Sequence, residues 1–186
     1  MAKKDKRTEI LDAALVLFAE NGFHGSPTSQ LAQRAGVGVG TIYRYFSDKD
    51  ELIRELYRDL KQKIGARIDE STPDLSMQER YVRMMTKFIN YFVQHRNEFR
   101  FMEQYYFSPY SAEFDCSAPE ENARIQQLLL AAREQGVVQD VSISVLQSLA
   151  FGPVIALVKE NIYRDLDLDD EMIRQTVEAT WTALEN

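Results

Sequence analysis

The amino-acid sequence predicts an all-α protein. Apolar residues recur every three or four positions in each long segment, as on one face of a helix, and no segment shows the sustained alternation of a β-strand. Proline and glycine separate these segments, and the separation around Gly36 is short enough for a tight turn between two helices. We expect about nine helices over the chain.

The first three helices are expected before residue 48. The apolar stripe of the first ends near Gly22, and the second begins at Ser26-Pro27, because a proline at the first helical position loses no hydrogen bond. Gly36 follows where the chain leaves the second helix and needs a positive φ, which glycine adopts at little cost. Ile42 and Phe46 lie four residues apart, so they share the buried side of a short third helix.

A fourth helix is expected to begin at Ser47, whose hydroxyl can cap it, and to run toward the break at residues 71–73. Such a helix would connect the N-terminal part to the rest without a flexible linker. The later breaks are proline, serine, glycine and a run of acidic residues. They divide the remainder into helices at about 76–95, 97–107, 118–135, 141–163 and 169–184.

Charge is unevenly distributed along the 186 residues. Residues 1–67 carry a net charge of +3 and the remainder −10, which together give the net charge of −7. A mildly basic N-terminal third on an acidic body suits a protein that contacts nucleic acid with one end only. One cysteine, Cys116, leaves no internal disulfide and fits a reducing cytoplasm.

Two segments have some of the features of membrane or targeting signals. The N-terminus is basic, but no apolar core follows it, so we do not expect a signal peptide. The longest uncharged run, residues 141–158, contains several serines and a Gly-Pro pair, and it is short for a membrane span. We interpret it as a buried helix.

Residues 26–49 have the layout of a helix-turn-helix, with a following capped helix. The run Gly-Thr-Ile-Tyr-Arg-Tyr-Phe at 40–46, with Ala-Gly-Val at 35–37 before it and Lys49 after it, is similar to the DNA-binding domain of the tetracycline-repressor (TetR) family. The resemblance covers about residues 7–60. It departs from the family pattern at Gly38, where a serine is common, and at Pro27, where a hydroxyl residue is common.

The resemblance implies an N-terminal helix-turn-helix domain at 1–48, a connecting helix at 49–70 and a C-terminal helical ligand-binding and dimerisation domain at 71–186. It also implies that the short third helix enters the major groove of double-stranded DNA. Arg44 either reaches guanine O6 and N7 or pairs with a phosphate, and one tyrosine could instead pack against the first helix. The expected DNA contacts are Thr28, Val39, Gly40, Thr41, Tyr43, Arg44, Tyr45 and Lys49.

The C-terminal part is rich in aromatic residues, which either line an effector cavity or pack as ordinary core. Aromatic faces beside the Glu103 carboxylate would suit a flat or cationic compound. The candidate effector residues are Phe88, Tyr91, Phe92, Met102, Glu103, Tyr105, Tyr106, Phe107 and Phe151.

The helix at 141–163 is apolar nearly all round, so either its own domain or a partner subunit must cover it. The resemblance implies that the last two helices pair with their copies in a homodimer, which suits a palindromic operator. The candidate interface residues are Leu146, Val154, Leu157, Val158, Val177 and Trp181.

These features favour a ligand-responsive transcriptional repressor that binds a palindromic operator as a dimer. The expected effector is a small apolar or aromatic compound, including a cationic one. The alternatives are an activator, or a small-molecule binding protein or enzyme with an incidental helix-turn-helix. No nucleophile, phosphate-binding loop or acid–base pair stands out, and neither histidine has a second ligand at metal spacing, so we expect no enzyme, metal or cofactor.

Overall fold

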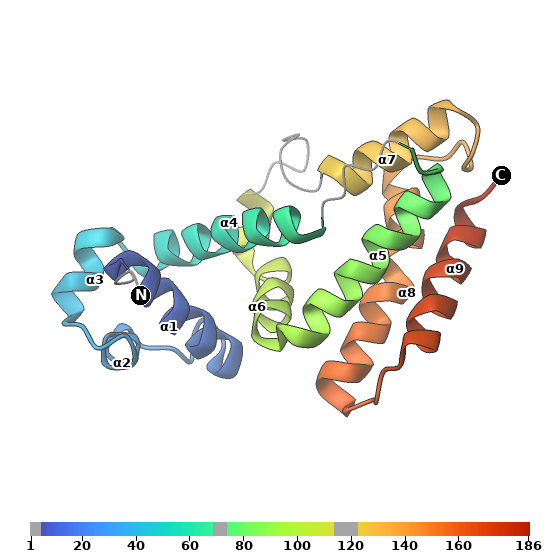
Figure 1. The fold of residues 1–186 in the computed structure, drawn as a ribbon. Helices are drawn as coiled ribbons and strands as arrows, with labels where there is room; N and C mark the ends of the chain where they lie inside the picture. The colour runs from blue at the N-terminus through green and yellow to red at the C-terminus, as the bar shows by residue number, and fades with distance from the viewer. Residues whose placement is uncertain (1–4, 69–73, 114–122) are drawn as a thin grey trace. The chain divides into compact units, whose positions relative to one another are not determined.

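The computed structural model describes residues 5–68, 74–113 and 123–186. Within them the chain forms nine α-helices and one 3-10 helix (Figure 1), and the only β pairing is an isolated bridge between Val138 and Glu185. The all-α prediction is therefore confirmed. Cys116 lies outside the described residues, as does the expected beginning of a helix at residues 118–122.

Beyond residue 74 the helices agree with those expected from the sequence. Each helix end that the structure describes lies within two residues of its expected position. Local caps account for several ends: the Asp169 carboxylate accepts the backbone N–H of Met172, and Asp165 ends a helix in the left-handed conformation. The elements are α1 Lys6–Asn21, α2 Thr28–Arg34, α3 Val39–Tyr45, α4 Lys49–Ile68, α5 Met77–Gln94, α6 Arg96–Tyr106, η1 Pro109–Glu113, α7 Ala123–Glu134, α8 Ile143–Arg164 and α9 Asp170–Leu184.

The helices group into two compact units. One contains α1, α2, α3, α6, η1 and α4 as far as Gln62; the other contains the end of α4, α5, α7, α8 and α9. The domains expected from the resemblance follow the order of the chain, whereas packing places α6 with the N-terminal helices. Phe101 of α6 is fully buried, and its ring lies 5.6 Å from that of Phe23 and 6.3 Å from that of Phe18.

The core of the second unit lies between α5, α8 and α9, which run side by side (Figure 1). The Tyr81 hydroxyl of α5 donates to Thr180 Oγ1 of α9 at 2.9 Å, and burial raises the pKa of Tyr81 to about 12. The Trp181 ring lies 5.2 Å from that of Tyr81. A buried, satisfied hydroxyl among apolar side chains holds these helices in one register.

Helix α8 is, among the described helices, the one long and apolar enough to cross a membrane by length and composition. One of its faces is buried against α5, α7 and α9, as in the core helix of a folded domain. The expectation of a buried helix is confirmed for that face only. Val145, Gly152 and Ala156 lie on an exposed face.

Candidate nucleic-acid interface

The turn between α2 and α3 has the backbone that its sequence predicts. Gly36 has a φ of +62°, and its N–H donates to Gln33 O, while the N–H of Val37 donates to Ala32 O at 3.0 Å. The two bonds close the end of α2 and satisfy carbonyls that would otherwise lack partners. A tight, fixed turn of this kind sets the angle between α2 and α3.

Helix α3 has two chemically different faces. Ile42 and, just beyond the helix, Phe46 are buried, as predicted. Val39, Tyr43 and Tyr45 are 39%, 51% and 38% exposed, although large hydrophobic side chains are usually covered. Gly40 and Arg44 are exposed as well, while Thr28 and Thr41 are half-buried. The exposed face therefore combines aromatic rings, hydroxyls and a guanidinium.

Helix α2 begins at Thr28, so Pro27 precedes the helix and does not occupy the first helical position that the sequence predicts for it. Ser26 does not cap α2: its buried hydroxyl donates to Gly22 O at 2.7 Å and to Leu17 O at 3.2 Å, because the side chain faces back toward α1. Pro27 occupies the capping position in an extended conformation and offers no side-chain acceptor.

The beginning of α4 is also capped differently from the expectation. Asp48, not Ser47, caps the helix, because its carboxylate accepts the N–H of Glu51 at 2.7 Å. The Glu51 carboxylate in turn accepts the backbone N–H of Ser47. The pair differs from a capping box, because Glu51 accepts the N–H of the residue before the cap and not that of Asp48 itself. The hydrogen bond from Ser47 lowers the pKa of Glu51.

Lys49, expected at a DNA phosphate, points into the loop between α1 and α2. Its ammonium donates to Phe23 O at 2.5 Å and to Ser26 O at 2.6 Å, and burial lowers its pKa. With Thr28 of α2 and Tyr43 of α3 it lines one small hollow, so the structure brings together three of the predicted DNA-contacting residues from three helices.

The candidate effector residues fall into two groups. In the second unit, Phe88 packs edge-to-face against Phe92 and Phe151, with ring centroids 4.8 and 5.5 Å apart, and Tyr91 packs against Phe92 in the same way. This second-unit cluster is the part of the predicted set that the structure brings together. The others, at or just after the end of α6 in the first unit, are Met102, Glu103, Tyr105, Tyr106 and Phe107.

The α6 group is itself divided. Tyr105 is buried and its ring stacks on that of Tyr57 at 3.8 Å, whereas Tyr106 and Phe107 are more than two-thirds exposed. Tyr105 therefore contributes to the core of the first unit. Sequence reasoning did not identify its partner Tyr57, because the two lie on helices far apart in the chain.

The predicted dimer-interface residues lie mostly inside one chain. Five side chains are almost fully buried in the second unit, and Leu157 is half-buried. These buried side chains hold α8 and α9 to their own unit. The positions of α8 and α9 that are exposed to solvent are therefore different from the ones predicted. The five are Leu146, Val154, Val158, Val177 and Trp181.

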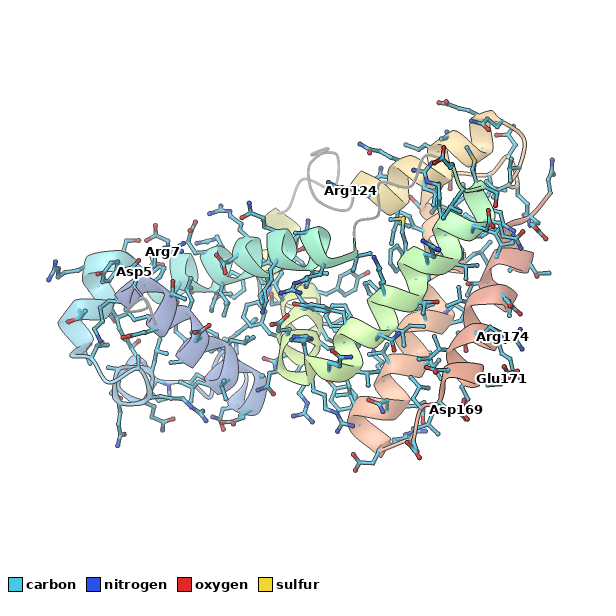
Figure 2. All side chains as sticks on the ribbon, in the orientation of Figure 1. Asp5, Arg7, Arg124, Asp169, Glu171 and Arg174 are labelled. Atoms are coloured by element: carbon cyan, nitrogen blue, oxygen red, sulfur yellow. The ribbon has the colours of Figure 1, made fainter. Side chains whose placement is uncertain are left out.

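The exposed side of α9 is charged near its beginning. Figure 2 shows Glu171 and Arg174 projecting from this helix, where the Arg174 guanidinium pairs with the carboxylates of Glu171 and Glu178, each at 2.6 Å. Exposed pairs of this kind contribute little to stability. The later exposed positions Ala179 and Ala183 are small.

Two helices joined by a fixed turn, the second presenting exposed aromatic and basic side chains, define a helix-turn-helix DNA-binding protein. Comparison with known proteins agrees with this class. The family model described as bacterial regulatory proteins of the tetR family matches residues 10–56, and a tetracyclin repressor-like C-terminal domain matches residues 76–185. The chain belongs to the TetR family of transcriptional regulators.

Individual relatives agree with this assignment. An HTH-type transcriptional regulator of Haemophilus influenzae is 27% identical over 99% of this chain and 98% of its own length. The fatty acid metabolism regulator protein of Bacillus subtilis is 41% identical over 73 residues, 39% of this chain but only 36% of that protein. The chain therefore matches little more than a third of the length of the fatty acid metabolism regulator protein.

Solved structures show the same fold. A TetR family transcriptional regulator from Vibrio parahaemolyticus is 30% identical over 98% of this chain and all of that chain, with a TM-score of 0.79. The transcriptional regulator FadR of Bacillus subtilis, solved in complex with stearoyl-CoA, is 19% identical over 96% of this chain and 99% of its own, with a TM-score of 0.72. At that identity the second likeness concerns the fold alone.

Proposed function

We propose that the protein is a ligand-responsive repressor that binds a palindromic operator as a homodimer. The observation that carries the proposal is the exposed face of α3. Val39, Tyr43 and Tyr45 stay in solvent although they are apolar or aromatic, and the turn at Gly36 holds the helix in one orientation. A rigid, exposed helix of two turns fits the major groove.

The exposed face divides into two kinds of contact. The hydroxyls of Thr28, Thr41, Tyr43 and Tyr45 are suited to phosphate oxygens, which position the protein without reading sequence. Arg44, together with Val39 and Gly40 at the beginning of α3, is suited to base edges. An arginine bidentate to guanine contributes about 1–3 kcal/mol of discrimination.

The dimer is proposed to form through the exposed faces of α8 and α9. An apolar helix with one exposed face is typically covered by another subunit, and small residues at that face let two backbones approach closely. The two-fold symmetry would present two copies of α3 to half-sites about one helical turn apart. The positions that we propose for contact are Val145, Gly152, Ala156, Leu157, Met172 and Ala179.

The effector is proposed to bind the second unit at the aromatic cluster of Phe88, Tyr91, Phe92 and Phe151. Such a site suits a small apolar or aromatic compound, including a cationic one. Because FadR of Bacillus subtilis was solved with stearoyl-CoA, a long-chain acyl-CoA is a reasonable first probe beside aromatic cations. By linkage, the effector weakens operator binding by the factor by which the operator weakens effector binding.

Selection of bound sites from random double-stranded DNA tests the proposal. We expect a palindrome, and we expect Arg44→Ala to relax preference at one symmetric base pair. A loss of affinity with unchanged preference would place Arg44 at the backbone. Absence of any preferred sequence would refute operator binding, and activation of transcription from the selected site in a purified system would refute repression.

A further inference from the structure

Lys49 occupies a position that disfavours a cation. It is the first residue of α4, where the aligned peptide dipoles present a partial positive charge. Its ammonium is half-buried and donates to Phe23 O and Ser26 O, at 2.5 and 2.6 Å. Two charge-assisted hydrogen bonds to backbone carbonyls are the contacts that compensate for this placement.

The two carbonyls belong to a loop that is already constrained. The Ser26 hydroxyl binds Gly22 O and Leu17 O from within, and the Phe23 ring packs edge-to-face on Phe18 at 5.5 Å. The loop therefore forms a firm anchor at the end of α1. Lys49 attaches the beginning of α4 to that anchor.

The attachment closes a ring in the chain. Phe23 lies shortly before α2, and Lys49 lies shortly after α3, so the segment between them contains the whole helix-turn-helix. With both ends joined at one ammonium, α2 and α3 have little freedom to turn relative to α4. Preorganisation of this kind lowers the ordering cost of binding.

Two carboxylate residues flank Lys49 in the chain. Asp48 lines the same hollow as Lys49, and Asp50 is the next residue along α4. The Asp50 carboxylate acts on the Lys49 ammonium, and a carboxylate near a cation weakens the attraction of that cation for a further anion.

We propose that Lys49 is a positioning residue, which locks the α1–α2 loop to α4 and so fixes α3 before DNA arrives, rather than a ligand of the phosphate backbone. This inference rests on the operator binding proposed above, but not on the dimer face or the effector. It assigns Lys49 a role different from the one that its place in the sequence predicts.

Free protein provides the first test. In Lys49→Met, hydrogen exchange at the amides that border the loop is expected to accelerate about 10- to 100-fold, as for the loss of a hydrogen bond from a charged donor. These amides are Gly22, which donates to Phe18 O, and Gln30 and Leu31, which donate to Pro27 O. Arg44→Met, which removes an exposed cation from α3, is the matched control and should leave this loop unchanged. An unaltered loop in Lys49→Met overturns the proposal, and this readout needs no DNA.

Operator affinity as a function of salt provides the second test. Each neutralised phosphate contributes about 0.9 to the slope of log affinity against log salt, so loss of two contacts per dimer would flatten the slope by about 1.8. For Lys49→Met we expect weaker binding by one constant factor at every salt concentration, with an unchanged slope. A flatter slope, or unchanged affinity, overturns the proposal.

Variant folding is checked by circular dichroism. Lys49→Gln, whose amide can donate to one carbonyl, receives the same two measurements and replaces Lys49→Met if that variant does not fold. Its effect on loop exchange should be smaller than that of Lys49→Met. A wild-type protein that binds no selected DNA would refute the proposed function. The exchange result would still test whether Lys49 holds the α1–α2 loop to α4.

Discussion

Removal of the Phe101 side chain tests whether α6 is part of the N-terminal unit. Phe101 is 0% exposed and its ring contacts those of Phe18, Phe23 and Tyr105 at centroid distances of 5.6–6.3 Å. Truncation of a fully buried phenylalanine to alanine costs about 3–5 kcal/mol, because burial is lost and a cavity remains. We expect Phe101→Ala to destabilise the first unit by that amount and to weaken operator binding, although α6 follows the helix-turn-helix by some 50 residues.

The assay separates the two units through their spectroscopic probes. Trp181 is the one tryptophan of the chain and lies in the second unit, so its fluorescence reports that unit, while circular dichroism reports helices of both. In urea, Phe101→Ala should shift the dichroism transition more than the fluorescence transition. Tyr106→Ala, on the same helix but 72% exposed, is the control and should change stability by less than about 0.5 kcal/mol.

Equal effects of Phe101→Ala and Tyr106→Ala would refute the reasoning. A Phe101→Ala substitution that shifts only the Trp181 fluorescence transition, and not the dichroism transition, would refute it as well. Either result would mean that α6 does not complete the core beneath α1.

Three further predictions concern the turn, the caps and the dimer. Gly36→Ala should lower the free energy of unfolding by about 1–2 kcal/mol, because Gly36 has a φ of +62°. Gly40→Ala should raise the free energy of unfolding by about 0.5–1 kcal/mol, because Gly40 lies inside α3 with open space around it. Chemical unfolding of both variants checks that the two changes have opposite signs. Hydrogen bonds from Ser47 and Ser76 hold the pKa values of Glu51 and Glu79 below the usual 4.5, so their contribution to stability is complete above about pH 4.5 and disappears as the pH falls through the lower folded values. Melting temperatures from pH 7 to pH 3 should fall less in the Glu51→Gln, Glu79→Gln double variant than in the wild type, and an identical fall would contradict the capping geometry. Ala156→Glu should convert a dimer to monomers in sedimentation, because two carboxylates would meet at the proposed contact; a persisting dimer would place the interface elsewhere.

Local features of the fold were predictable from the sequence. The turn at Gly36 depends on one backbone angle that glycine favours, and the pairing of Ile42 with Phe46 depends on helical periodicity alone. Caps were less certain, because Ser47 and Asp48 are adjacent and both can accept a hydrogen bond from the helix.

Contacts between distant segments were not predictable. Nothing in the sequence near Phe18 indicates that Phe101 covers it, and hydrophobic periodicity does not reveal which apolar face of α8 its own unit buries. This is why Val154 and Val158 were predicted for a partner and instead lie in the core. A single sequence does not show which helix or subunit covers a given apolar face.

Lys49 shows the same limit at the candidate DNA interface. Its position after the Tyr-Arg-Tyr-Phe run indicates a basic residue near DNA, whereas the direction of its ammonium depends on a loop more than 20 residues earlier. Helical periodicity alone predicts which residues of α3 are exposed. Tyr43, Arg44 and Tyr45 are therefore exposed to solvent as expected.

Hydroxyl-radical footprinting of a selected operator tests the central claim most directly, since it maps where two copies of α3 contact one duplex. The account predicts two equal protected patches on one face of the DNA, related by a two-fold axis and about one helical turn apart. A single patch, or uniform protection along the duplex without a centre of symmetry, would contradict it.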